Sequence, residues 1–214
     1  MMTNQNIINV KEDVKKELTT KQSAVIDAAI SLFSQKGFSN TSTGEIARKA
    51  SVSEGSIFRH FHDKEHLLLA ILDPLTSKIL PSELNAITNK MFHSEKLELL
   101  DFITMLIEDR SKFINLNLDV FKIFISEALY TPVVREKIFQ AISQEDLNEF
   151  FKVIDNLKKN KRMVNWTNAE IMGYIATNIT GFILNYFVIF HQNWEDTEQA
   201  RQNLIDFLVK GLTP

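Results

Sequence analysis

The sequence predicts an all-α protein with a small N-terminal head and a larger helical body. The 214 residues include only 6 Gly and 4 Pro, and no segment alternates Val, Ile or Thr between turn residues as a strand would. Long stretches instead repeat apolar residues at helical spacing. With 44% hydrophobic and 24% charged residues, the composition is that of an ordinary soluble globular protein.

The head follows residues 1–18, which are polar and are expected to form a loosely ordered arm. Apolar side chains then share one face of a first helix, Lys21–Lys36, and Gly37 ends this helix. A second helix is predicted to begin with a capping box. In it, the Ser42 side chain bonds the backbone of Glu45, and the Glu45 side chain bonds the backbone of Ser42.

A third helix is predicted after the break at residues 51–53. Ile57 and Phe61 are four positions apart, and both are expected to face the interior of the head. Two short helices joined by such a turn form a helix-turn-helix, here at residues 43–62. The outer face of its second helix is the one that can enter a DNA major groove.

A fourth helix is predicted from residue 63 towards residue 80, with Pro74 interrupting its regular hydrogen bonding. The step from Asp73 to Pro74 is therefore the expected joint between head and body. Residues 81–94 are expected to open with a turn or short helix and are otherwise hard to assign. The body is then predicted to contain helical stretches at residues 94–116, 118–130, 132–159, 167–191 and 196–210.

Residues 171–194 contain no Asp, Glu, Lys or Arg. A segment of this length would suit a membrane span. Polar residues such as Asn178 and Asn185 are nevertheless spread around it, and nothing else in the sequence is typical of a membrane protein. A helix that is buried on two sides is therefore the preferred interpretation, and no membrane association is expected.

Composition and charge limit the setting in which the protein works. There is no Cys, which excludes disulfides and fits the cytosol, and the N-terminus lacks the apolar stretch of a signal peptide. The net charge is −3, but it is unevenly divided. Residues 1–64 carry 9 Lys and Arg against 7 Asp and Glu, giving +2, whereas residues 65–214 carry 15 against 20, giving −5. This asymmetry suits a cytoplasmic protein with a DNA-binding head.

The flanks of the helix-turn-helix make the motif more specific. Residues 21–72 contain, in order, Gly37-Phe38, Thr41-Ser42-Thr43, Ile46-Ala47, Ala50-Ser51-Val52-Ser53, Phe58-Arg59-His60-Phe61 and Lys64-Glu65-His66-Leu67. This series resembles the N-terminal domain of bacterial transcriptional regulators of the TetR (tetracycline repressor) family. There are two departures from the family pattern. Ser51 stands where a turn Gly is usual, and Phe58 replaces a Tyr and so lacks the hydroxyl that would contact a phosphate.

The resemblance implies a domain organisation and a function. Residues 19–73 would be the DNA-binding domain, and residues 74–214 a bundle for ligand sensing and dimerisation. The last two long helices, within residues 167–210, would pair with their copies in a homodimer, with Ile183 and Phe187 at the interface. Such a protein would be a one-component regulator, most often a repressor, released from a palindromic operator by a small hydrophobic or aromatic effector.

The same resemblance marks the residues expected to face DNA, namely Ser42, Thr43, Glu54, Gly55, Ser56, Phe58, Arg59, His60 and Lys64. Arg59 has the fork-shaped group that reads guanine O6 and N7, and Glu54 either accepts from cytosine N4 or simply favours a helix N-terminus. Ser42 and Thr43 stand where the family contacts phosphate. Lys64 matches a phosphate-contacting Lys of the family.

A ligand cavity in the body is predicted from its aromatic residues. The candidate lining residues are Phe102, Leu106, Arg110, Phe113, Phe121, Phe124, Phe139, Asn178, Phe182, Asn185 and Tyr186. Ligand sites are mostly apolar with a few convergent polar groups, and this set has that composition. The alternative for each aromatic residue taken singly is that it belongs to the ordinary core.

Other classes of protein have weaker support in the sequence. His62 and His66 have a spacing that zinc sites use, but no third ligand is placed near them, so no metal is predicted. No nucleophile elbow, phosphate-binding loop or H-E-x-x-H motif is present, so neither an enzyme nor a cofactor is expected. An all-α protein-interaction module that does not bind DNA remains the alternative.

Overall fold

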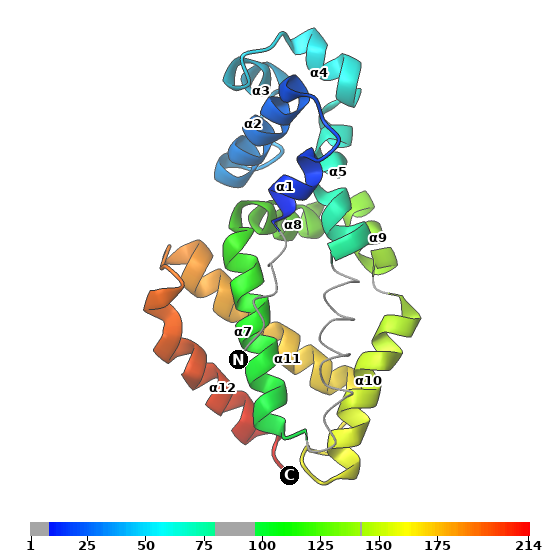
Figure 1. Cartoon of the computed structure of the whole chain (residues 1–214), viewed down its shortest axis with the longest axis vertical. Helices are drawn as coiled ribbons and strands as arrows, with labels where there is room; N and C mark the ends of the chain where they lie inside the picture. Colours follow the sequence, from blue (N-terminus) through cyan, green and yellow to red (C-terminus); the bar gives the residue numbers. More distant parts are fainter. Residues whose placement is uncertain (1–8, 80–96, 142) are drawn as a thin grey trace. The chain divides into compact units, whose positions relative to one another are not determined.

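The computed structural model describes residues 9–79, 97–141 and 143–214 (Figure 1). Within these ranges the regular elements are all helices, so the all-α prediction is confirmed. Residues 80–96, which include the whole segment 81–94 that the sequence leaves hard to assign, lie outside the described residues. The chain divides into two compact units. Unit 1 comprises Met1–Pro81 and Asn117–Ile142, and unit 2 comprises Ser82–Leu116 and Ser143–Pro214.

Four helices of unit 1 form the predicted head: α2 (Thr20–Lys36), α3 (Thr43–Lys49), α4 (Glu54–Phe61) and α5 (Lys64–Pro74). Helix α2 packs against α3 and α5, and α4 packs against both α3 and α5. The interior between them is apolar and fully enclosed, with Ile26, Ile46, Ile57 and Leu67 all at 0% exposure. Burial of these side chains is what stabilises helices as short as α3 and α4, which would not persist in isolation.

Pro74 ends the α-helical part of α5, as its chemistry predicts. It has no N–H to donate to the preceding turn. The chain continues as a π-helix, η1 (Leu75–Ile79), and the Thr76 hydroxyl donates to the carbonyls of Leu72 and Asp73, at 3.3 Å each. The predicted interruption is therefore confirmed, and it takes the form of a wider helical turn rather than a break.

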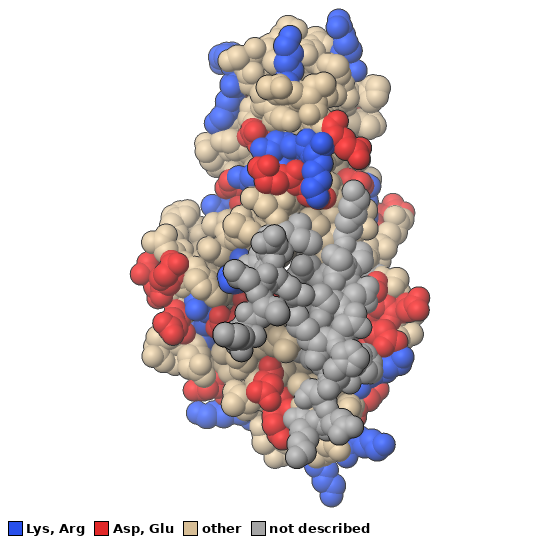
Figure 2. Space-filling view, in the orientation of Figure 1, with Lys and Arg blue, Asp and Glu red and all other residues tan. Residues whose placement is uncertain are grey.

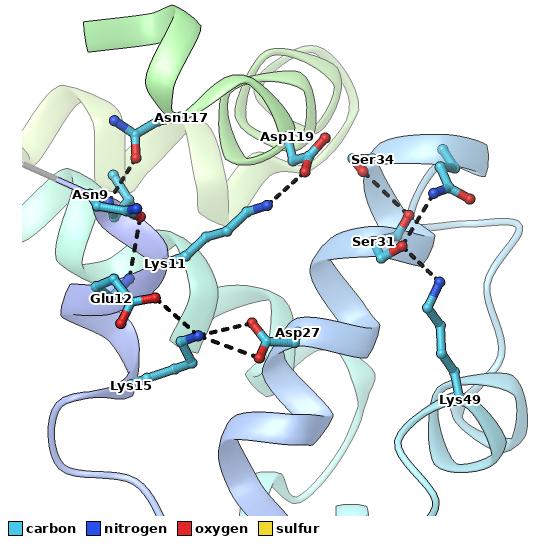
Figure 3. A network of polar contacts seen from close by, with 12 residues as sticks. Asn9, Lys11, Glu12, Lys15, Asp27, Ser31, Ser34, Lys49, Asn117 and Asp119 are labelled. Atoms are coloured by element: carbon cyan, nitrogen blue, oxygen red, sulfur yellow. Dashed lines mark hydrogen bonds and ion pairs between the residues drawn. The ribbon is translucent and has the colours of Figure 1, made fainter. Parts of the chain in front are cut away.

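The expectation of a loosely ordered arm is wrong for residues 10–15, which form helix α1 (Val10–Lys15) (Figure 3). Val10 is completely buried, and its backbone N–H donates to the Asn117 side chain at 2.7 Å. The Lys15 ammonium lies 3.3 Å from the Asp27 carboxylate on α2. Helix α1 also packs against α5. Polar composition misled the sequence-based expectation, because a single buried valine and its partners on distant helices hold the arm.

Unit 1 is completed by α8 (Leu118–Tyr130) and α9 (Pro132–Ala141). Helix α8 has the bounds predicted from its sequence. It packs against α2, α5 and α9, and the Lys11 ammonium of α1 lies 2.7 Å from the Asp119 carboxylate. Helices α8 and α9, which were predicted to belong to the body, therefore lie in the same compact unit as the head. A functional boundary between head and body near Pro74 stays a prediction.

Unit 2 contains α7 (Leu99–Leu116), α10 (Gln144–Lys159), α11 (Asn168–Ile183), the π-helix η2 (Leu184–Ile189), the short 3-10 helix η3 (Glu195–Thr197) and α12 (Glu198–Leu212). Helix α7 packs against α11 and α12, and α10 packs against α11. A ring contact between Phe102 and Phe150, with centroids 5.8 Å apart, joins α7 to α10. Helices from two separate segments of the chain therefore share one apolar interior.

One buried cation fixes the turn into the last helix. Arg201 is 5% exposed and donates to the Glu108 carboxylate at 3.0 Å and to the Trp194 carbonyl at 2.7 Å. Its guanidinium also lies 3.6 Å from the centroid of the Trp194 ring. A buried charge is tolerated only when it is paired and hydrogen-bonded, and these contacts meet that requirement. They tie α12 to α7 and to the turn before α12.

The prediction of one helix over residues 132–159 is wrong, because α9 ends at Ala141 and α10 begins at Gln144. Ser143 caps α10, and its side chain and that of Asp146 form a reciprocal capping box. A single serine within a long amphipathic pattern does not by itself indicate that a new helix begins there. The Ser-x-x-Asp spacing is the signal that could have located this one.

Candidate nucleic-acid interface

The capping box predicted at the start of α3 is present. The Ser42 hydroxyl accepts from the Glu45 N–H at 3.2 Å, and the Glu45 carboxylate accepts from the Ser42 N–H at 2.9 Å. The Lys36 ammonium at the end of α2 also pairs with Glu45. This pairing, together with the bonds from Ser42, lowers the pKa of the Glu45 carboxyl to about 2. The N-terminus of α3 is thus held rigidly against α2.

The turn of the helix-turn-helix has the left-handed backbone that the family glycine would allow. Ser51 has a φ of 55°. The N–H of Ser51 donates to the Arg48 carbonyl at 3.2 Å, and that of Val52 donates to the Ala47 carbonyl at 3.0 Å. These bonds satisfy carbonyls at the end of α3 and direct the chain into α4. The turn therefore keeps a left-handed residue, with serine where the family usually has glycine.

Helix α4 has one inner and one outer face, as predicted. Ile57 is 0% and Phe61 8% exposed, and both lie in the interior of the head. The opposite face carries Gly55, Arg59 and His60, which are exposed, together with the half-buried Ser56 and the 46% exposed Phe58. All of these residues belong to the predicted DNA-facing set. The outer face of α4 therefore presents a guanidinium, an imidazole and small residues that permit close approach to a surface.

Two members of the predicted set bond each other. The Thr43 hydroxyl at the start of α3 donates to the Glu54 carboxylate at the start of α4. This bond links the first residues of the two helices and fixes the direction of the carboxylate. The structure therefore gives Glu54 a role within the head, and a bond to a cytosine amino group stays a prediction.

Lys64 is bonded within the head, and a contact of its ammonium with phosphate stays a prediction. Its ammonium donates to the Phe38 and Thr41 carbonyls, at 2.8 Å each, and lies 4.3 Å from the centroid of the Phe38 ring. An open hollow adjoins it, lined by Ser39, Asn40, Thr41, Ser42, Thr43, Glu45, Phe58 and Lys64. The hollow therefore brings together Ser42, Thr43, Phe58 and Lys64 of the predicted set.

Sequence reasoning missed the residues that hold this region together, namely Lys36, Phe38 and Thr41. A Lys in the last turn of a helix is favourable in any case, so nothing in the sequence singles out the pairing of Lys36 with Glu45. The Thr41 side chain is 2% exposed and donates to the Gly37 carbonyl at 2.9 Å. These contacts depend on the loop conformation, which only the folded head defines.

Positive charge surrounds the outer faces of α3 and α4. Arg48, Lys49 and Arg59 are exposed. On the face in Figure 2, the part of the head that carries α3 and α4 shows Lys and Arg side chains, and the acidic side chains lie nearer α1. Such a distribution favours binding of an anionic polymer at this end of the head.

The predicted ligand-lining residues are divided between the two units. Phe121, Phe124 and Phe139 belong to unit 1, while Phe102, Leu106, Arg110, Phe113, Asn178, Phe182, Asn185 and Tyr186 belong to unit 2. Within unit 2, the rings of Phe182 and Tyr186 lie 4.7 Å apart. Phe139 and Asn185 are exposed, and the Asn178 amide donates to the Tyr174 carbonyl of its own helix at 2.8 Å. A cavity formed by all of these residues stays a prediction.

Two further features of the sequence have structural counterparts. The His62 and His66 rings meet edge to face with centroids 5.7 Å apart, and the Asp63 carboxylate lies 2.9 Å from Nδ1 of His66. The Asp63 carboxylate also accepts from the N–H of His66 and caps α5, and these bonds lower the pKa of Asp63.

Among the described residues, one helical stretch, Asn168–Ile189, is long and apolar enough to cross a membrane by length and composition alone.

The similarity to known proteins is concentrated in the head. The model of a family described as "Bacterial regulatory proteins, tetR family" matches residues 25–71, which contain α3, α4 and most of α2 and α5. This part of the chain belongs to the TetR family. Its match to the transcriptional regulator AcrR of Shigella flexneri is 43% identical over 65 residues, covering 30% of each chain. Matched segments span about a third of the curated TetR-family relatives, at 30%, 35% and 28% of their lengths.

Solved TetR-family structures resemble the chain over nearly its whole length. A regulator from Shewanella sp. PV-4 matches with a TM-score of 0.62 and 22% identity, covering 92% of this chain and 100% of the other. The regulator FadR of Bacillus subtilis, in complex with stearoyl-CoA, matches with a TM-score of 0.58 and 16% identity, covering 88% and 97%. The helical body therefore shares the fold of these TetR-family structures.

Proposed function

We propose that this TetR-family protein is a one-component transcriptional regulator that binds double-stranded DNA as a homodimer. The observation that carries the proposal is the two-faced helix α4. Ile57 and Phe61 anchor it in the head, while Arg59, Ser56 and Gly55 are directed outward beside the basic residues of α3. A short helix presented in this way can enter the major groove.

The proposed contacts are of two kinds: contacts to base edges, which recognise the DNA sequence, and contacts to the DNA backbone, which orient the protein. Arg59 donates two bonds to guanine O6 and N7, the commonest base-specific contact of a protein. Ser42 and Thr43 contact a phosphate from the capped start of α3, and His60 contacts the DNA backbone. Phe58 has no hydroxyl, so its exposed ring contributes only apolar contact with a sugar or a thymine methyl group.

Dimerisation is proposed through α11 and α12, within residues 167–210. Most residues of the apolar stretch Asn168–Ile189 are not buried within the chain, so this stretch needs a second partner surface. Large apolar side chains on α11, η2 and α12 are exposed, with Tyr174 at 54%, Ile189 at 63% and Phe207 at 63%. Unit 2 thus offers an apolar surface that a second copy of the chain would bury. Burial in this dimer interface is proposed instead of burial in a membrane.

Regulation is proposed to follow from a shift between two arrangements of the dimer. Two heads bind successive major grooves of a palindrome only when they stand about 34–36 Å apart. A ligand that binds more tightly to a second arrangement of the dimer, one that does not fit DNA, shifts the population towards that arrangement. The resulting loss of DNA affinity is limited by the difference between the ligand's affinities for the two arrangements. The FadR structure of Bacillus subtilis contains stearoyl-CoA, which supports a largely hydrophobic effector for this protein. If effector binding releases the protein from its operator, this cytoplasmic protein acts as a repressor.

Selection of bound duplexes from bacterial genomic fragments tests the proposal. The selected site should be an inverted repeat bound by two chains. Arg59→Ala should weaken binding by about 1–3 kcal/mol and relax preference at one base position in each half-site. Arg135→Ala, which removes an exposed arginine of α9, is the matched control and should leave both unchanged. Failure of the wild-type protein to enrich any duplex would favour an all-α protein-interaction module instead.

A further inference from the structure

Helix α1 precedes the residues matched by the family model, which begin at residue 25, yet it is an integral part of unit 1. On the side of the head, α1 packs against α2 and α5. The Lys15 ammonium of α1 also lies 3.3 Å from the Asp27 carboxylate of α2 (Figure 3). One side of α1 is therefore attached to the head by both packing and charge.

A second set of contacts attaches α1 to the start of α8. The buried Val10 N–H donates to the Asn117 side chain at 2.7 Å, and the Lys11 ammonium lies 2.7 Å from the Asp119 carboxylate (Figure 3). Asn117 is the single residue between the end of α7 and the start of α8. Helix α7 packs against α11 and α12, which are the helices of the proposed dimer interface. Helix α1 therefore joins the head to the point at which the chain leaves α7.

The bonds between α1 and α8 are strong enough to influence a binding equilibrium. A buried N–H that loses its acceptor shifts an equilibrium by about 5- to 150-fold. The Lys11–Asp119 pair contributes much less, because its two side chains are 33% and 43% exposed. Coupling between separate sites of a protein is of the same size, about 5- to 150-fold. Loss of the contacts between α1 and α8 should therefore be measurable as a change in operator binding.

A dimer that binds a palindrome must hold its two heads at one separation. Successive major grooves are about 34–36 Å apart. One base pair added between the half-sites moves them apart by roughly 3.4 Å and also turns one of them around the DNA axis. Loosely attached heads lose more freedom when both half-sites are bound, but they tolerate a changed spacing better than firmly attached heads. The attachment of the head thus affects both operator affinity and the spacing that is accepted.

We propose that α1 is a brace that holds each head on α8 and thereby sets the half-site spacing of the operator. The inference rests on the proposed binding of DNA as a homodimer. A head that turned relative to α8 would have to break either the contacts of α1 with α2 and α5 or those with α8. Lys11 and Asn117 are therefore positioning residues, which act by holding α1 and not by contact with DNA.

The test uses the full-length double variant Lys11→Glu with Asn117→Ala, which removes both bonds to α8 and keeps the Lys15–Asp27 pair. Affinity is measured for the selected palindrome and for duplexes whose half-sites lie one or two base pairs closer together or farther apart. The brace predicts about tenfold weaker binding to the selected palindrome. It also predicts that the ratio of affinities between the selected and the altered spacings falls towards one. An unchanged dependence on spacing would overturn the proposal.

Lys16→Glu is the matched control. It makes the same change of charge on an exposed lysine that pairs with Asp13 of α1 itself and not with α8. Any loss from the reduced positive charge should be equal at every spacing, so the control should keep the spacing dependence of the wild type. A duplex with a single half-site needs only one head, and the double variant should bind it as tightly as the control does. A weaker half-site complex would show that the substitutions damage the head itself, and it would overturn the brace.

Hydrogen exchange without DNA shows whether the two bonds hold α1 in place. The Asp13 N–H donates to the Asn9 carbonyl at 3.0 Å, and its exchange should become about tenfold or more faster in the double variant, because α1 is released from α8. The Lys16→Glu control should exchange more slowly than the double variant at this amide. Equal exchange in the wild type and the double variant would mean that these bonds do not hold α1, and the proposal would fail.

A charge exchange covers the case in which the double variant does not fold. Lys11→Glu alone places a second carboxylate beside Asp119 and should weaken the dependence on spacing, whereas adding Asp119→Lys should restore it. A single variant that behaves as wild type, or a second substitution that restores nothing, would contradict the brace. If the wild-type protein binds no duplex, the proposed function fails. If it binds inverted repeats of every spacing equally well, the proposed function stands and only the brace is wrong.

Discussion

With His62, Ser51 is one of two non-glycine residues in the described part of the head whose φ is positive. Its φ of 55° lies in the left-handed region, where a side chain other than glycine is crowded by the backbone. The hydrogen bonds of the turn hold it there, because the Val52 N–H must reach the Ala47 carbonyl for α4 to begin at its observed angle. Some stability is therefore lost at the turn in return for the position of α4.

Ser51→Gly should stabilise the protein. Glycine adopts this conformation without strain, so the free energy of unfolding should rise by up to about 1 kcal/mol. Ser53→Gly is the matched control, because Ser53 has a φ of −74° and makes no side-chain capping bond. This control should leave stability unchanged or lower it slightly. Equal effects of the two substitutions in chemical denaturation would show that the left-handed turn costs nothing.

Glu45 makes the head sensitive to acid. Pairing with Lys36 and bonds from Ser42 lower its pKa to about 2, from an ordinary value of 4.5. A carboxyl group with a lowered folded-state pKa stabilises the fold above its unfolded pKa, and this contribution is lost as pH falls through the folded pKa. The relevant window therefore runs from about pH 4.5 down to about pH 2.

Glu45→Gln should remove this pH dependence while keeping an acceptor for the capping box. The stability difference between wild type and variant should be largest above pH 4.5 and should shrink towards pH 2. Denaturant unfolding at pH 7, 4.5 and 2.5 measures it. A difference that stayed constant over this range would show that the charge of Glu45 contributes nothing to the head.

At the scale of the element, α1 shows how a six-residue helix can be held by capping from elsewhere in the chain. Asn117 stands at the N-cap position of α8, yet its side chain makes no capping bond to α8 and accepts from the buried N–H of Val10. The first turn of α1 is thereby satisfied by a residue 107 positions away. Helix α1 is stable only because α2, α5 and α8 are already assembled.

Asn117→Ala should destabilise unit 1 by about 1–3 kcal/mol, because it leaves the buried Val10 N–H without an acceptor. Lys11→Met is the comparison, since it breaks the Lys11–Asp119 pair on the surface, where such pairs contribute about 0–1 kcal/mol. Chemical denaturation, with hydrogen exchange at Val10, measures both. A larger loss from Lys11→Met than from Asn117→Ala would mean that surface charge, rather than the buried bond, holds α1.

At the scale of the whole molecule, the question is which surface of unit 2 is covered by a second chain. The sequence placed Ile183 and Phe187 at the dimer interface, but both are completely buried within a single chain. A charge at either position would therefore damage the fold before it tested the interface. The exposed Tyr174 on α11 and Phe207 on α12 are the positions that test dimerisation.

The double substitution of Tyr174→Asp with Phe207→Asp should give folded monomers. A desolvated, unpaired carboxylate at the centre of an apolar interface costs several kcal/mol, which is enough to dissociate a dimer at micromolar concentration. Phe139→Asp is the control, because Phe139 is 80% exposed on α9 and lies outside the proposed interface. Sedimentation should show monomers for the first variant and dimers for the control. A fully dimeric double variant would place the interface elsewhere.

The sequence alone was sufficient wherever a few neighbouring residues decide the structure. The Ser42–Glu45 capping box and the inward face of α4 both depend on spacings of three or four residues, and each was predicted correctly. Helical periodicity likewise located α2 and α8. Local hydrogen bonding and side-chain direction along a helix are nearly independent of the rest of the chain, so these features can be derived from residue types.

Only the tertiary structure decided features that depend on residues distant in sequence. The sequence does not reveal that the Lys64 ammonium bonds carbonyls 23 and 26 positions earlier, because the loop that carries them is shaped by the folded head. Likewise, a polar N-terminal segment became α1 because Asn117 accepts a bond from Val10. Phe187 was known to be apolar, but whether it faced its own chain or a second one depended on the packing of unit 2. Residue type specifies what a group can bind, whereas the fold determines which of the possible partners lies within reach.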